Sequence, residues 1–162
     1  MEVQFVLDKS VNSRLPTTAT AGSAALDFYA AEDVTLPGFG RGAVATGVTV
    51  SWDHEDAYLQ LFSRSGLFKN FGITCEAGVI DIDFNLPISV LLQNHTPDSY
   101  EVKVGDRIAQ GIFLWKVPIR TYYHVTSEIA MVTDTEPICH QIFTYDPHLG
   151  QVRVGGLGST GR

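Results

Sequence analysis

The sequence predicts an all-β domain, a sandwich or a barrel of short strands. The first observation is that short segments rich in β-branched and aromatic residues recur along the chain, separated by Gly, Pro, Asn and Asp. The second is that apolar residues almost nowhere recur with the period of a helix. The third is size, because 162 residues, 44% of them hydrophobic and 18% charged, fit one globular domain with its own core.

Nine segments carry the strand pattern. In chain order they are residues 3–7, 25–30, 42–52, 57–62, 87–94, 99–104, 107–115, 120–125 and 138–145. Pro87 has no N–H for a ladder, so it must stand at a sheet edge, at a strand start or at a bulge. Residues 65–71, SGLFKNF, are the one stretch that fits a helical turn entered through Ser65, although the pattern favours an irregular connector between strands.

The charge balance excludes several classes of partner. The formal net charge is −7, whereas proteins that bind nucleic acid or a membrane surface need a basic footprint. Cys75 and Cys139 are the only cysteines and lie far apart, which predicts reduced thiols rather than a disulfide framework. The sequence shows neither an export signal nor a membrane-spanning stretch, so we expect a soluble, intracellular protein of the cytoplasm or nucleus.

Several common catalytic motifs are missing from the sequence. The five histidines show neither HxH nor HExxH spacing, which argues against a zinc site. Neither a GxSxG elbow nor a Walker loop occurs, which removes two large enzyme classes. The remaining candidates for chemistry are polar residues set in turns and between apolar runs.

Two carboxylates interrupt an apolar run in AGVIDIDFNLPISV, residues 77–90. In a strand, side chains two residues apart share a face, so Asp81 and Asp83 would point together. Ile80, Ile82 and Phe84 would then point the other way. Burying two unpaired like charges would cost several kcal/mol. The pair must therefore face water, a cation or a functional site.

Two turn segments combine glycine with charged residues. Residues 63–66, SRSG, place a guanidinium and a hydroxyl where free N–H groups at a helix start favour an anion, but an ordinary N-cap is the simpler interpretation. Residues 105–107, GDR, precede an apolar run in which Gln110 is an unusual polar interruption. An ion pair between Asp106 and Arg107 that braces the turn is the structural alternative there.

Taken together, five stretches resemble, in order, the five motifs of the homotrimeric dUTPase family. They are residues 21–30 (AGSAALDFYA), 64–67 (RSGL), 78–84 (GVIDIDF), 105–110 (GDRIAQ) and 155–161 (GGLGSTG). One such tetrapeptide would be uninformative, but five in this order are specific. The resemblance implies a jelly-roll-like β-barrel, a homotrimer with sites between subunits, and hydrolysis of dUTP to dUMP and pyrophosphate.

The resemblance assigns the third motif to the base and to the attacking water. Family members form a hairpin there, here Gly78, Val79 and Ile80, whose backbone groups pair with uracil and leave no room for a 5-methyl group. Asp81 would be the general base that deprotonates the water attacking the α-phosphorus, a role that suits a carboxylate ionised at pH 7. Phe84 stands where the family usually has Tyr. Its ring would keep the steric filter against a ribose 2′-OH but would lack the phenol hydrogen bond.

By the same resemblance, the other motifs hold the triphosphate. Arg64, Ser65 and Gly66 would bind phosphate oxygens, and Gln110 would add an amide contact. Mg²⁺ would bridge the phosphates, with Asp27 positioning the ion through its water shell. Magnesium keeps several waters and takes few protein ligands, so the absence of a carboxylate cluster does not argue against it.

The last motif departs from the family pattern. Leu157 replaces the aromatic residue that caps uracil, a loss that would cost about 1–3 kcal/mol and raise KM. Val152 stands where the family carries an arginine for the γ-phosphate. The other candidate substrate contacts in this region are Arg153, Gly158, Ser159 and Thr160. We expect residues 1–154 to form the barrel domain and residues 155–162 a flexible, Gly-rich arm.

Two alternative functions stay open at this level. The extended segment 118–151, and Asn85-Leu86 in place of the usual Arg-Gly, would suit a catalytically weakened relative that binds a protein partner through residues 118–151. A dCTP deaminase, which resembles dUTPases through the second to fourth motifs, would need a catalytic Glu where Leu91 stands. An active dUTP diphosphatase is favoured by the survival of Asp27, Arg64, Ser65, Asp81 and Gln110.

Overall fold

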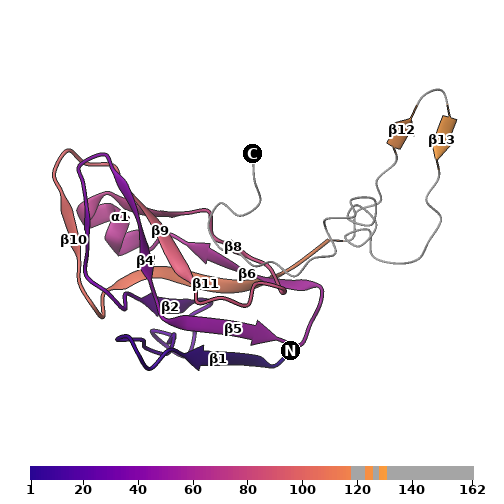
Figure 1. Ribbon diagram of the computed structural model, residues 1–162, viewed down its shortest axis with the longest axis horizontal. Coiled ribbons are helices and arrows are strands. Elements are labelled where there is room, and N and C mark those ends of the chain that lie inside the picture. The colour runs from indigo at the N-terminus through magenta and orange to yellow at the C-terminus, as the bar shows by residue number, and fades with distance from the viewer. Residues whose placement is uncertain (118–122, 126–127, 131–162) are drawn as a thin grey trace.

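The computed structural model describes residues 1–117, 123–125 and 128–130, which form strands and one short helix (Figure 1). The helix is α1 (Ser65–Phe71). The strands are β1 (Val3–Leu7), β2 (Leu26–Tyr29), β3 (Val34–Leu36), β4 (Arg41–Ala45), β5 (Val48–Trp52), β6 (Ala57–Phe62), β7 (Ile73–Glu76), β8 (Val79–Ile80), β9 (Ser89–Asn94), β10 (Tyr100–Val102), β11 (Arg107–Trp115), β12 (Tyr123–Val125) and β13 (Glu128–Ala130). The prediction of an all-β domain is confirmed.

The strands pair antiparallel in several small sheets. The largest sheet has the order β2-β11-β6-β8, and a second has the order β4-β9-β7. Two-stranded ladders join β1 to β5, β10 to β3 and β12 to β13. Within the described residues these ladders do not close into a continuous ring. The jelly-roll-like architecture is therefore made of open sheets, and the four-stranded sheet carries three of the five predicted motifs.

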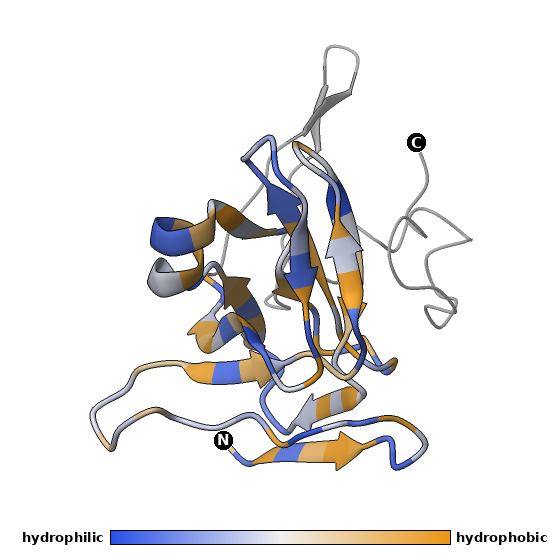
Figure 2. Ribbon diagram, turned by 90° about the vertical axis from the view of Figure 1, so that its left-hand side faces the viewer, coloured by the Kyte–Doolittle hydropathy of each residue, from blue (hydrophilic) through white to orange (hydrophobic). Residues whose placement is uncertain are grey.

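The core joins the four-stranded and the three-stranded sheet, and it is built by alternation along the strands. In β6, Ala57, Leu59 and Leu61 are buried, whereas Tyr58 and Gln60 between them are only half-buried. Figure 2 shows strands in which hydrophobic and hydrophilic residues alternate in this way. The largest fully buried apolar side chains are Phe28, Leu36, Leu59, Ile73, Ile88, Leu92 and Ile108. Burying a side chain of this size contributes about 1.5–3 kcal/mol, so the core holds β2 and β11 rigidly in place.

The segment predicted as one long strand, residues 42–52, is two strands. β4 pairs with β9, whereas β5 pairs with β1. Gly47, between them, has a φ of +64°, and a Cβ there would lie 2.6 Å from the Val11 side chain. This left-handed residue lets the chain pass from one sheet to the next. Pro87 lies two residues before β9, outside the strand, so it need not donate to the ladder.

Residues 65–71 form a helix, so the prediction of an irregular connector is wrong. Leu67 is buried under the helix and anchors it to the core. Gly72 ends the helix in the left-handed conformation with a φ of +66°, and its N–H donates to the carbonyl of Phe68 at 2.8 Å. Among the described residues, no helix has the length and apolar character needed to cross a membrane.

Some predicted features lie outside the described residues. They are the strand at 138–145, most of the segment 118–151 and the arm at 155–162. β12, which pairs with β13, falls inside the predicted strand at 120–125.

Candidate active site

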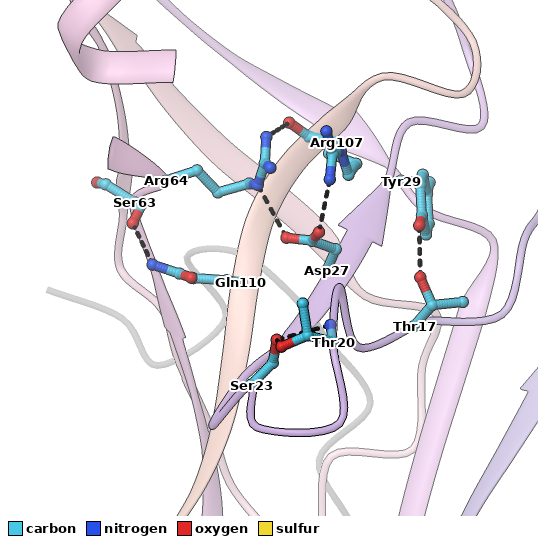
Figure 3. A network of polar contacts seen from close by, with 9 residues as sticks. All are labelled: Thr17, Thr20, Ser23, Asp27, Tyr29, Ser63, Arg64, Arg107 and Gln110. Carbon is cyan, nitrogen blue, oxygen red and sulfur yellow. Dashed lines mark hydrogen bonds and ion pairs between the residues drawn. The ribbon is translucent and has the colours of Figure 1, made fainter. Parts of the chain in front are cut away.

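Asp27 on β2 lies at the centre of an ion-paired cluster. Its side chain is only 11% exposed. Its Oδ1 accepts a hydrogen bond from Arg64 Nε at 2.8 Å, and its Oδ2 accepts one from Arg107 Nη1 at 3.2 Å (Figure 3). Arg64 Nη1 also donates to the backbone carbonyl of Arg107 at 3.1 Å. A carboxylate buried this far needs such cations, because an uncompensated buried charge is strongly destabilising. The first, second and fourth motifs therefore meet at one carboxylate.

Gln110 ties β11 to the segment that leads into α1. Its Nε2 donates to the carbonyl of Ser63 at 2.9 Å (Figure 3). The Ser63 hydroxyl in turn accepts from the N–H of Cys75 at 2.8 Å, which fixes this segment to β7. Gln110 also stands opposite Asp27 in the β11–β2 ladder. The polar interruption in this apolar strand thus holds the second motif beside Asp27.

The start of α1 is open. Arg64 is the N-cap residue with an extended backbone (φ −92°, ψ 130°), and within the described part of the chain no side chain caps the first turn. Ser65 is the first helical residue, so the interpretation of residues 63–66 as an ordinary side-chain N-cap is wrong. The first N–H groups of a helix have no partner inside it. At Gly66 an added Cβ would meet no atom within 4 Å, so the backbone here is accessible to an anion.

β8 places the third motif at the edge of the four-stranded sheet. The ladder pairs Ile80 with Leu59 and Val79 with Gln60. The N–H of Leu61 donates to the carbonyl of Gly78 at 2.7 Å. A Cβ at Gly78 would lie 2.3 Å from the carbonyl oxygen of Leu61, so the close approach of β6 requires glycine here. Because β8 is an edge strand, its other side presents backbone groups that no described strand pairs.

The side chains of the third motif face different surroundings. Ile80 is 8% exposed and belongs to the core, whereas Val79 is 56% exposed. A ligand can therefore reach Ile80 only through its backbone. Phe84 is half-buried and packs against the core, which restricts the positions of its ring.

The two acidic residues of this motif lie in a turn. β8 ends at Ile80, and the N–H of Phe84 donates to the carbonyl of Asp81 at 3.1 Å. Asp81 is half-buried and Asp83 is exposed. The prediction that both carboxylates share one face of a strand is wrong, because a turn does not follow the two-residue period. The hairpin implied by the resemblance is not present among the described residues, because β8 pairs only with β6 and the turn at 81–84 leads into no strand that pairs with β8.

The turn before β11 is held by its backbone and by Asp106. Gly105 has a φ of +86°, and the N–H of Asp106 donates to the carbonyl of Lys103 at 2.9 Å. The Asp106 Oδ2 accepts from the N–H of Lys103, also at 2.9 Å. Arg107 binds Asp27 instead. The alternative in which Asp106 and Arg107 pair with each other is therefore wrong.

Two clefts flank the segment between β6 and α1. The larger has a volume of about 610 Å³, and its lining includes Ser63, Gly78 and Gln110. The smaller has a volume of about 330 Å³, and its lining includes Arg64, Gly66 and Arg107. The residues assigned to the triphosphate thus line adjoining surfaces. Asp81 and Phe84 line neither of these clefts.

One chain holds the third motif away from the arginine cluster. β8 and β2 are the opposite edges of one sheet, three strand spacings or about 14 Å apart. Ile80 pairs with Leu59, whereas Gln110 pairs with Phe62, which adds about 10 Å along the strands. Asp81 directly follows Ile80. A single copy therefore brings together Asp27, Arg64 and Gln110 but not Asp81.

Cys75 lines the larger cleft but is not a nucleophile at neutral pH. Burial, followed by the nearby Glu76 carboxylate, raises the pKa of the Cys75 thiol to about 11. The thiol therefore stays protonated, and the reactive form of a cysteine is the thiolate. Chemistry at this cleft must use another group or a water.

Most, but not all, of the residues in this cluster could be predicted from the sequence. Arg107 and Ser63 were not among the predicted site residues. Both lie in stretches that the sequence singles out, but each acts through contacts to residues far away in the sequence, which local spacing cannot show. The predicted contacts in the last motif, namely Arg153, Leu157, Gly158, Ser159 and Thr160, lie outside the described residues.

Three comparisons with known proteins all match this chain to dUTPases. The dUTPase family model matches residues 11–136. The deoxyuridine 5′-triphosphate nucleotidohydrolase of Yarrowia lipolytica is 37% identical over 150 residues, which are 93% of this chain and 83% of that protein. A mutant of the Staphylococcus bacteriophage 80alpha dUTPase with dUpNHpp has a TM-score of 0.67 at 22% identity, covering 80% of this chain and 92% of that one. A mutant dUTPase from phage phi11 of S. aureus, described with a structural Mg(II) ion, has a TM-score of 0.65 at 21% identity. The match covers 84% of this chain and 99% of that one.

Proposed function

Because the chain belongs to the dUTPase family, we propose that it hydrolyses dUTP to dUMP and pyrophosphate with the residues described above. The observation that carries this proposal is the meeting of Asp27, Arg64 and Gln110, from three separate motifs, beside the open start of α1. Release of pyrophosphate from dUTP by the purified protein is the direct test.

The triphosphate is held by Arg64 and by the start of α1. A guanidinium carries five N–H donors, and the contacts to Asp27 and to the Arg107 carbonyl use two of them. The backbone N–H groups at Ser65 and Gly66 add donors that need no rearrangement. Gln110 uses one amide hydrogen on Ser63 and has a second for a phosphate oxygen. Such oriented donors stabilise the charge that develops during phosphoryl transfer.

Uracil binds along the edge of β8. The backbone of Val79 and Ile80 offers N–H and C=O groups on the side away from β6, which can pair with the polar edge of a base. Gly78 fixes the position of this edge, because β6 approaches it closely. The Phe84 ring, held against the core, lies next to the sugar and excludes a ribose 2′-OH.

Asp81 is the general base. A carboxylate is ionised at pH 7 and needs only hydrogen-bond reach of the attacking water. Its position in the turn directly after β8 supports this role, because a base bound along β8 would lie next to it. The α-phosphorus of a bound dUTP is separated from that base by the sugar. Asp81 can therefore accept a proton from a water that attacks the α-phosphorus.

Mg²⁺, when bound with the triphosphate, would neutralise part of the phosphate charge. The described residues contain no group of three or more His, Cys, Asp or Glu that could hold a metal ion. Both oxygens of Asp27 already accept from arginines, but a carboxylate has about four lone-pair sites, so Asp27 can also accept from a metal-bound water. These residues fit an ion that is bound mainly by phosphates and water, with Asp27 contacting its water shell.

A homotrimer completes the site. One copy keeps β8 far from the arginine cluster, so Asp81 of one copy must act on a triphosphate held by another. The outer face of the four-stranded sheet supports this arrangement, since Phe62 is 39% exposed and Val79 is 56% exposed. Cyclic symmetry then makes equivalent sites, and we propose that residues 155–162 form an arm that reaches a neighbouring copy.

The trimer has a direct test. Sedimentation equilibrium at micromolar protein should give a mass three times that of one chain. A purely monomeric protein that nevertheless hydrolyses dUTP would contradict the shared site.

Gly66→Ala is expected to lower dUTP affinity without harming the fold. The added methyl group meets no atom of the chain within 4 Å, and Ala in a helix is more stable than Gly by about 0.5–1 kcal/mol. A phosphate seated on this backbone would collide with the methyl group. We expect KM for dUTP to rise by about tenfold, from one lost contact of about 1.4 kcal/mol, while the melting temperature stays the same or rises.

Gly22→Ala is the matched control, because a Cβ at Gly22 also meets nothing within 4 Å. It should leave KM unchanged. An unchanged KM in both variants would show that the triphosphate does not touch the start of α1.

A further inference from the structure

A β-bulge in β11 brings Arg107 to the same side of the strand as Gln110. The ladder pairs Gln110 with Asp27, Ala109 with Phe28 and Arg107 with Tyr29. Ile108 is therefore an extra residue, and both Ile108 and Ala109 are buried. In a regular strand, residues three apart point to opposite faces, but one inserted residue reverses this relation. The bulge thus turns the Arg107 side chain toward Asp27.

Arg107 touches both other members of the cluster. Its side chain donates to Oδ2 of Asp27 at 3.2 Å, and its carbonyl accepts from Nη1 of Arg64 at 3.1 Å. Asp27 Oδ1 accepts from Arg64 Nε at 2.8 Å. The terminal torsion of an aspartate is broad, so one contact would not fix which way the carboxylate faces. The second contact, from Arg107, holds Oδ1 toward Arg64.

We infer that Arg107 is a positioning residue: through Asp27 and its own carbonyl, it fixes the Arg64 guanidinium where the triphosphate binds. This inference rests on the proposed function of Arg64. The Arg107 side chain is 49% exposed and lines the same cleft as Arg64 and Gly66, so a direct phosphate contact is the competing role. The two roles differ in whether the effect of Arg107 depends on Arg64.

Arg107→Met keeps the apolar stem and removes the cation. We expect kcat/KM for dUTP to fall by about tenfold to a hundredfold, because a group displaced by about 1 Å can cost that much. Most of the loss should lie in kcat. Arg107→Lys should recover part of the activity, since the contact to Asp27 uses a single N–H donor. The control is Arg41→Met, which removes an exposed arginine from β4 and should change neither constant.

The decisive experiment is a double-mutant cycle with Arg64→Met, followed by pyrophosphate release in excess Mg²⁺. If Arg107 acts through Arg64, Arg107→Met has almost no further effect once Arg64 is gone. An equal loss in both backgrounds would overturn the inference, as would full activity of Arg107→Met alone. If Arg107→Met does not fold, Arg107→Lys takes its place in the cycle, with the same outcomes. Failure of both variants to fold would make the role structural and overturn the inference.

Binding of dUpNHpp, measured by calorimetry on the same four proteins, separates this inference from the proposed function. If the wild-type protein binds dUpNHpp but does not hydrolyse dUTP, the proposed function fails and the cycle is evaluated on Kd. If the wild-type protein neither binds nor hydrolyses, both are overturned. If hydrolysis is normal and the cycle is additive, only the inference fails.

Discussion

Asp81→Asn is expected to lower kcat for dUTP hydrolysis by about 10²–10⁴-fold, with little change in KM. The amide can still hydrogen-bond the attacking water but cannot accept its proton at pH 7. The substitution keeps the side-chain size, and the backbone hydrogen bond from Phe84 to Asp81 does not involve the side chain. Steady-state pyrophosphate release at saturating and at low dUTP gives both constants.

Asp83→Asn is the matched control, because it makes the same change of charge in the same turn. Asp83 is exposed, so its substitution should alter kcat by no more than about twofold. Equal activity of the two variants, whether high or low, would mean that Asp81 is not the general base.

Arg64→Met is expected to lower kcat/KM by about 10²–10³-fold, the range found when one preorganised donor is removed from a developing charge. The fold should weaken as well. Asp27 loses its partner at 2.8 Å and keeps only Arg107, which we expect to cost about 1–3 kcal/mol of unfolding free energy. Kinetics and the thermal unfolding midpoint measure the two effects separately.

Arg41→Met again serves as the control, since it removes one positive charge from an exposed site on β4. It should leave kcat/KM and the unfolding midpoint unchanged. A folded Arg64→Met protein with wild-type kcat/KM would contradict the assignment of Arg64 to the triphosphate.

The strand content could be predicted from the sequence because it depends on local pattern. Alternation in β6 and the branched residues of β9 are visible in any short window. The short strands β3, β7, β8 and β13 were missed as separate strands, because two to four residues carry too little pattern. α1 was missed because its stability comes from Leu67 in the core and from the left-handed Gly72, neither of which gives a helical repeat.

The pairing within the site could be predicted only in part. Resemblance indicated Asp27, Arg64 and Gln110, and the structure brings these three together. The sequence could not indicate that Arg107 binds Asp27. Counted by alternation from Gln110, the Arg107 side chain would lie on the opposite face of the strand. One inserted residue, Ile108, reverses that relation, and a bulge of this kind leaves no mark in the hydrophobic pattern. Local pattern also fails at Asp81, because β8 ends at Ile80 and the alternating residues 81–84 lie in a turn instead of continuing the strand.

We propose that this chain converts dUTP, and no other common nucleotide, to its monophosphate and pyrophosphate. The most direct test is pyrophosphate release by the purified protein with Mg²⁺ and each of dUTP, dTTP, dCTP and UTP. We predict turnover of dUTP alone, because in the proposed site the edge of β8 would pair with uracil and leave no room for a 5-methyl group, and the Phe84 ring would exclude a 2′-OH. Equal turnover of UTP or dTTP, or no turnover of millimolar dUTP by folded protein, would contradict the claim.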